Sequence, residues 1–171
     1  DEVPSRGLGD VYKRQVESTL PGYARIVSAC GLTYSAFAIT GGSGRLQTGI
    51  RILCRELKKQ ILQDGGHISR EPKHLAQLLM DLTAIRLAMQ QRHIEVPQDI
   101  NASCKLISSA IDFYCFPDGQ FCIFNGRTQG EKSLIDAAKK LKPKNSKGFQ
   151  YATASGCLLY TSDAADEADG G

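Results

Sequence analysis

Apolar residues recur at three- and four-residue steps along most of this chain, and such a pattern predicts helices rather than strands. The predicted helices cover Ala24 to Ile39, Leu46 to Ile61, Leu75 to Met89 and Ile100 to Cys115, followed by a shorter one from Lys132 to Leu141. Turn-forming glycines and prolines separate them. Helices of this length joined by short loops are typical of a helical bundle or an (α/α) toroid.

The residues between the apolar stretches predict where the helices begin and end. Ser43 is a candidate N-cap for the second helix, because its hydroxyl can accept a hydrogen bond from a free backbone N–H. Gly65, in Asp64-Gly65-Gly66, can supply the left-handed conformation that often ends a helix. Pro72 suits the first position of the third helix, where a missing N–H costs nothing.

The pattern changes in the last third of the chain. Phe121 and Ile123 lie between two turn dipeptides, Asp118-Gly119 and Asn125-Gly126, which predicts a short extended stretch. After the lysine-rich link 142–147, alternating Phe149, Tyr151 and Thr153 predict the first strand of a β domain.

Both ends of the chain are expected to be translated sequencing adaptor, not native protein. Asp10–Gln15 back-translates to GATGTGTATAAGAGACAG, and the reverse complement of that oligonucleotide, shifted by one base, encodes Cys157–Ser162. Two distant stretches of a natural gene have no reason to be reverse complements. We therefore assign 1–15 and 157–171 to adaptor and exclude them from the fold. The rest, 16–156, is expected to be an internal fragment of a longer protein.

Excluding the two ends changes the charge. Residues 1–15 hold three basic and three acidic residues and residues 157–171 hold four acidic ones, so the remainder carries a net charge of +7 instead of +3. A basic surface favours anionic partners, although a solvated basic face needs none. The basic residues are scattered without a recognisable binding motif, which argues against nucleic acid.

Other composition signals narrow the possibilities further. No apolar run reaches the roughly 18 residues that a membrane-spanning helix needs. The cysteines of 16–156 are odd in number and lack C-x-x-C spacing, so neither a zinc site nor a disulfide framework is predicted. No nucleotide-binding loop is present, because Gly41-Gly42-Ser43-Gly44-Arg45 lacks the required Gly-Lys-Ser/Thr. We predict no metal and no cofactor.

Two strings could carry chemistry. Gln63–Pro72 places His67 and Arg70 on a tight turn between two long helices, a common position for binding groups. The alternative is a plain helix connection whose polar residues cap backbone groups. In the second string, Tyr114–Gly126, Asp118 and Asn125 could hold a ligand, although both also fit ordinary turns.

Taken in order, "ILQDGGHISREP" and "AIDFYCFPDGQFCIFNG" resemble the heparinase II/III-like family of bacterial polysaccharide lyases. The closing "GFQYATASG" looks like the start of that family's C-terminal β-sandwich. The resemblance implies a mainly α fold, with an incomplete (α/α) toroid fragment at 16–147 and the start of a β-sandwich domain at 148–156.

The resemblance also implies a reaction, β-elimination on a uronic-acid-containing polysaccharide. His67 matches the position that neutralises the uronate carboxylate, and Arg70, Asp118 and Asn125 would bind substrate. The family's catalytic tyrosine falls near Phe121–Phe124, where this chain has no hydroxyl. The family's other catalytic group, a histidine of the sandwich, would lie beyond the fragment, so the full-length parent is expected to be a lyase and the fragment to be inactive alone.

Further expectations follow from the same resemblance. The partner would be an acidic polysaccharide, and the location the periplasm or cell envelope of a bacterium, with the cytoplasm as a second possibility. The alternative function is a non-catalytic protein of the same fold that binds acidic glycans or belongs to the cell envelope. The oligomeric state is left open.

Overall fold

The computed structural model describes residues 21–39, 41–115 and 132–140. Within these ranges the chain is helical and has no strand, only an isolated antiparallel bridge between Ile61 and His67. The helices are α2 (Tyr23–Ala38), α3 (Ser43–Gln60), α4 (Pro72–Gln91), α5 (Gln98–Phe113) and α6 (Lys132–Lys140). The predicted mainly α fold is confirmed.

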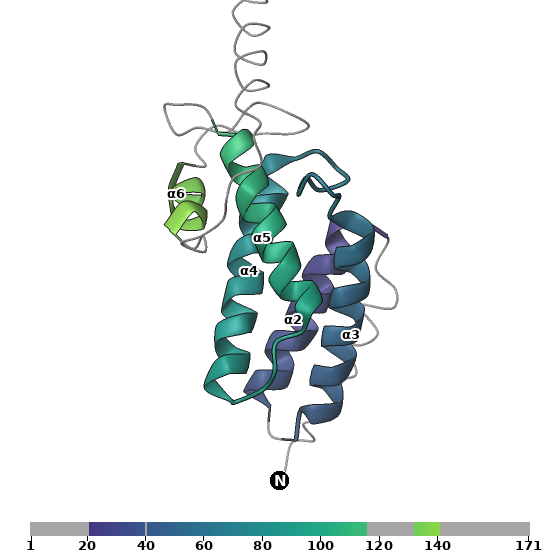
Figure 1. The fold of residues 1–171 in the computed structure, drawn as a ribbon. Coiled ribbons are helices and arrows are strands. Elements are labelled where there is room, and N and C mark those ends of the chain that lie inside the picture. The colour runs from purple at the N-terminus through teal and green to yellow at the C-terminus, as the bar shows by residue number, and fades with distance from the viewer. Residues whose placement is uncertain (1–20, 40, 116–131, 141–171) are drawn as a thin grey trace, which may run out of the picture.

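Four of the helices form a bundle in which each packs against two neighbours (Figure 1). α2 and α5 each pack against both α3 and α4. α2 and α4 run in the same direction, since Tyr23 lies by Gln77 and Phe37 lies by Arg92, just after the end of α4. The bundle therefore consists of two helical hairpins, α2/α3 and α4/α5. α6 packs on α4, outside the four.

The bundle is held together by apolar side chains that all four helices contribute. α4 supplies the largest share, because its leucines and other apolar residues recur at helical spacing and face inward. Burying one such side chain completely stabilises the fold by about 1.5–3 kcal/mol. The largest fully buried side chains are Ile26, Leu32, Leu53, Leu57, Leu75, Leu78, Leu79, Leu82, Ile85, Met89 and Ile100.

Two of the predicted helix ends are wrong in detail. Ser43 is the first helical residue of α3 and not its cap; Gly42 caps the helix, with no side-chain hydrogen bond. An alanine Cβ at position 42 would lie 2.3 Å from the carbonyl oxygen of Ala36, so only glycine lets the α2/α3 turn close this tightly. α3 ends at Gln60, not at Gly65, whose φ of 79° serves the following loop. Pro72 is the first residue of α4, as predicted.

Several expectations fall on residues outside the described ranges. These are the strand at 148–156, the stretch Phe121–Ile123, and the ligand candidates Asp118 and Asn125. The closure of the helices into a toroid is likewise not established by the part of the chain that the structure describes. Among the helices of that part, none is long and apolar enough to cross a membrane.

Candidate functional site

The loop between α3 and α4 carries the most distinctive polar groups of the described chain. It turns back on itself, because Gly66 accepts a hydrogen bond from the Leu62 N–H and Ile68 N–H donates to the Gln60 carbonyl, both at 2.9 Å. Asp64 stabilises the turn by accepting a hydrogen bond from the Gly66 N–H at 2.8 Å. The loop thus places His67 across the end of the bundle, where α2 begins.

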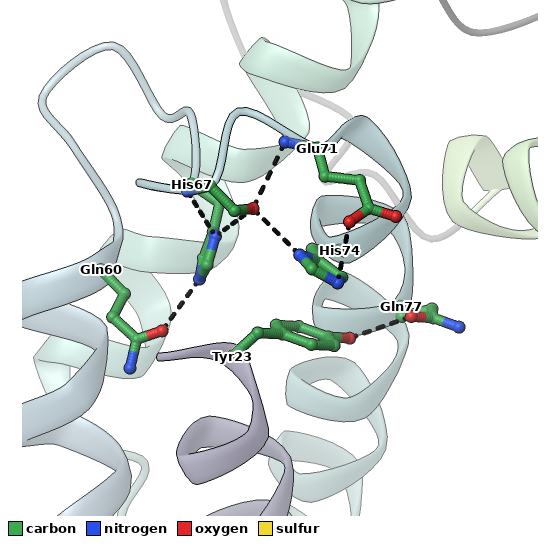
Figure 2. Close-up of polar contacts among 7 residues, drawn as sticks. Tyr23, Gln60, His67, Glu71, His74 and Gln77 are labelled. Atoms are coloured by element: carbon green, nitrogen blue, oxygen red, sulfur yellow. Dashed lines mark hydrogen bonds and ion pairs between the residues drawn. The ribbon is translucent and has the colours of Figure 1, made fainter. Parts of the chain in front are cut away.

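His67 is buried, with 1% of its surface exposed. Both ring nitrogens have partners: Nε2 lies 2.9 Å from Oε1 of Gln60, and Nδ1 lies 2.8 Å from the Ser69 hydroxyl (Figure 2). The Ser69 backbone N–H also donates to Nδ1 at 3.1 Å. Buried polar groups normally find such partners, so His67 is a satisfied interior residue.

Gln60, the last residue of α3, links the imidazole to the start of α2 and to a carboxylate on its own helix. Its Nε2 donates to the carbonyl oxygen of Gly22, just before α2, and to Oε2 of Glu56, both at 3.0 Å. Glu56 is itself buried, although Arg55 lies 3.4 Å from its other oxygen. The amide therefore presents its oxygen, an acceptor, to His67.

A second imidazole continues the network on α4. Nδ1 of His74 lies 3.0 Å from the Ser69 hydroxyl, and its Nε2 lies 3.2 Å from Oε2 of Glu71. The Tyr23 ring stacks on His74, with 3.6 Å between ring centroids, and meets His67 edge-on at 5.6 Å. The Tyr23 hydroxyl in turn donates to Gln77. Figure 2 shows these side chains converging from α2, α3, α4 and the loop.

The surroundings change the proton affinity of both imidazoles. Burial, together with the nearby His74, lowers the pKa of His67 to about 4. Burial also lowers the pKa of His74, while the adjacent Glu71 carboxylate acts in the opposite direction. In both rings, burial thus favours the neutral imidazole.

Arg70 occupies the outer side of the same loop. Its guanidinium donates to Oδ2 of Asp64 at 2.7 Å, and its backbone has a φ of 56°, which is uncommon outside glycine. About half of its side chain is exposed. Arg70 and His67 therefore face different surroundings, one open to solvent and the other closed by Gln60 and Ser69.

Most residues of the hydrogen-bonded network around His67 were not predicted from the sequence. His74 was not among the predicted site residues, yet it is largely buried and shares a hydroxyl with His67. Tyr23 and Gln60 carry no signal in the sequence that marks them as partners. The spacing of Glu71 and His74, three residues apart at a helix start, is the one local clue. In the described part of the chain, no cluster of His, Cys, Asp or Glu is arranged to hold a metal ion.

Comparison with known proteins finds a partial similarity to a bacterial protein. The chain is 31% identical over 110 residues to "FtsZ-localized protein C" of Caulobacter vibrioides. The matched segment covers 64% of this chain but only 19% of that protein. No protein-family profile matches the chain, and no solved structure matches it either.

This similarity overturns the assignment to the heparinase II/III-like family and, with it, the lyase and glycan-binding functions. The relative is named for its localisation with FtsZ, and nothing found supports a lyase family or an acidic polysaccharide partner. The physical reason for the error lies in the strings that carried the resemblance. Asp-Gly-Gly turns and a proline at a helix start serve any helix–loop–helix, so they do not mark a family. The roles of His67, Arg70, Asp118 and Asn125 came with that family and stay predictions without it.

Proposed function

We propose that this chain is part of a cell-division-associated protein that localises with FtsZ, and that its helical bundle is a non-catalytic module of it. The observation that carries the proposal is the 31% identity over 110 residues to a protein named for FtsZ localisation. Because the chain spans only 19% of that relative's length, the activity and partners of the whole protein are part of the proposal and not of the similarity.

The chemistry of the bundle is consistent with a structural or docking module. His67 has both nitrogens engaged by Gln60 and Ser69 in a closed interior, which leaves no lone pair or N–H for a substrate. A general acid or base must reach the group that it protonates or deprotonates. The bundle then acts by presenting its surface to a partner protein.

Imaging tests the localisation. The 171-residue chain, fused to a fluorescent protein, is expressed in Caulobacter vibrioides cells that carry FtsZ labelled in a second colour. We expect the two signals to coincide in dividing cells. Leu82→Asp, which places a charge in the core, serves as the unfolded control and should abolish the coincidence. A diffuse signal from a wild-type chain shown to be folded by circular dichroism would contradict the proposal.

The same experiment tests location, for which the sequence predicts the periplasm or cell envelope, with the cytoplasm as a second possibility. Co-localisation with FtsZ would replace the expectation of a periplasmic or envelope location, whereas an envelope signal that does not coincide with FtsZ would support it. The larger architecture of the parent protein, a toroid followed by a β-sandwich, is a separate proposal. Recovery of the complete gene and the structure of its product test it directly.

A further inference from the structure

Two imidazoles in this molecule share one hydroxyl group. Oγ of Ser69 lies 2.8 Å from Nδ1 of His67 and 3.0 Å from Nδ1 of His74, and the two rings are 5.5 Å apart. A serine hydroxyl has a single proton to donate, so it cannot donate to both rings at once. The protonation state of one ring must therefore determine whether the other ring receives the hydrogen bond from the Ser69 hydroxyl.

The proton positions on His67 follow from its partners. The Gln60 amide nitrogen already donates to Gly22 and Glu56, so its oxygen faces His67 and requires a proton on Nε2. The Ser69 backbone N–H points at Nδ1, which must then be unprotonated. His67 is thus neutral, with its proton on Nε2.

His74 has a different choice. Its Nε2 faces the Glu71 carboxylate, which can only accept, so Nε2 carries a proton. When the ring is neutral, Nδ1 accepts the Ser69 hydroxyl proton. When the ring is charged, Nδ1–H donates to Oγ of Ser69, and the hydroxyl is released to donate to His67.

We propose that His67, Ser69 and His74 form a two-stage proton switch: the first proton binds His74 and turns the Ser69 hydroxyl toward His67, and the second binds His67 and releases the loop. The second stage follows from geometry. A proton on Nδ1 of His67 would face the Ser69 N–H donor at 3.1 Å, so one of the two must move. The switch is independent of the proposed division role.

The charges around the two rings set the order of protonation. His74 has a carboxylate at its Nε2 and a Tyr23 ring stacked against it, and both stabilise a cationic imidazole. Among the described residues, no carboxylate is in contact with His67, which is more deeply buried and has a pKa of about 4. The charged or titratable groups in this network include Tyr23 and Cys30 on α2, Arg55 and Glu56 on α3, Asp64 and Arg70 on the loop, Glu71 at the start of α4, Lys73 and Asp81 on α4, and Tyr114 after α5.

Side-chain nitrogen NMR of the full chain, recorded from pH 7.5 to pH 3.5, tests the first stage. The ¹⁵Nδ1 signal of His67 is expected to move twice, a small shift at the midpoint of His74 and a large one at its own, lower midpoint. Ser69→Ala removes the shared hydroxyl and should leave one step. His93→Asn, at an exposed site with a φ of 55° that asparagine tolerates, is the matched control and should leave both steps. A single step in the wild type, or proton uptake at His67 before His74, would overturn the proposal.

Hydrogen exchange of the same chain tests the second stage. Corrected for the intrinsic effect of pH, the Ile68 and Ser69 amides should exchange at least tenfold faster below the His67 midpoint than above it, while the Leu79 amide in α4 stays protected. His67→Asn can place an amide oxygen near the Nδ1 position and cannot take up a proton, so its loop should not respond to acid. If that variant does not fold, the acid response of the loop amide exchange rates is compared between Ser69→Ala and wild type instead, and this comparison decides. Loss of protection at Leu79 together with the loop would show global unfolding and would overturn the switch.

Discussion

At Gly65 the backbone passes unusually close to α5. A Cβ built there would lie 2.2 Å from the carbonyl oxygen of Leu106, and φ is 79°, a conformation that L side chains rarely adopt. Both effects act against any larger residue. The position is therefore required for the α3–α4 loop to close onto the bundle.

Gly65→Ala is expected to lower the free energy of unfolding by about 2 kcal/mol or more, because the side chain brings both strain and a clash. Urea unfolding followed by circular dichroism measures the change. Gly31→Ala is the matched control: Gly31 lies inside α2, and a Cβ there meets nothing within 4 Å. That substitution should stabilise the chain by about 0.5–1 kcal/mol. Equal effects at the two sites would contradict the reading of Gly65.

His67 predicts how stability depends on pH. Its pKa is about 4 in the folded chain and about 6.5 when unfolded, so between these values the unfolded state binds more protons. Stability from this group is complete above about pH 6.5 and falls as the pH drops toward 4, by on the order of 2 kcal/mol at pH 4.5. Urea midpoints measured across this window should show a shallower slope in His67→Asn than in wild type. An unchanged slope would mean that other groups cause the acid sensitivity.

Among the elements, α4 packs against α2, α5 and α6, and its packing should dominate stability. Leu82 is fully buried, whereas Leu87, five residues later on the same helix, is 52% exposed. Leu82→Ala should cost about 2–5 kcal/mol through lost burial and a residual cavity. Leu87→Ala should change stability by less than about 0.5 kcal/mol. Thermal melts of the two variants provide the comparison, and similar losses would show that α4 is oriented differently.

The helices themselves were largely predictable from the sequence. α4 carries leucines at helical spacing and begins at Pro72, so both its existence and its start follow from local chemistry. The end of α3 was missed because Ile61 continues the apolar pattern beyond the last helical residue, Gln60. Its side chain stays in the core while its backbone pairs with His67. Periodicity indicates which side chains are buried, but it does not distinguish a helical backbone from the bridged backbone at Ile61.

The candidate site was predictable only in part. The position of His67 on a tight loop between helices follows from Gly65 and Pro72 nearby in the sequence. Its burial does not, because the groups that enclose it include Tyr23, 44 residues earlier, and the position of that ring depends on how α2 packs on α4. Contacts between distant segments leave no local pattern.

For the molecule as a whole, the assignment of both ends to adaptor sequence leads to a direct test. A chain limited to 16–156 should keep the helix content and the melting temperature of the 171-residue chain to within about 2 °C. The reason is that translated adaptor has not been selected for contacts with the core. Circular dichroism of the two chains measures both quantities. A loss of more than about 5 °C on removing the ends would show that they contribute to the fold.

The bend after α3, which is the α3–α4 loop, also affects how many copies of the chain can assemble. It joins the α2/α3 hairpin to the α4/α5 hairpin, and each hairpin covers the apolar face of the other. Were the bend to straighten, one copy's second hairpin would fit equally well onto another copy's first, giving an exchanged dimer with the same interior. Acid that loosens the bend would then favour dimers over single chains, and neutral pH would trap whichever form was present.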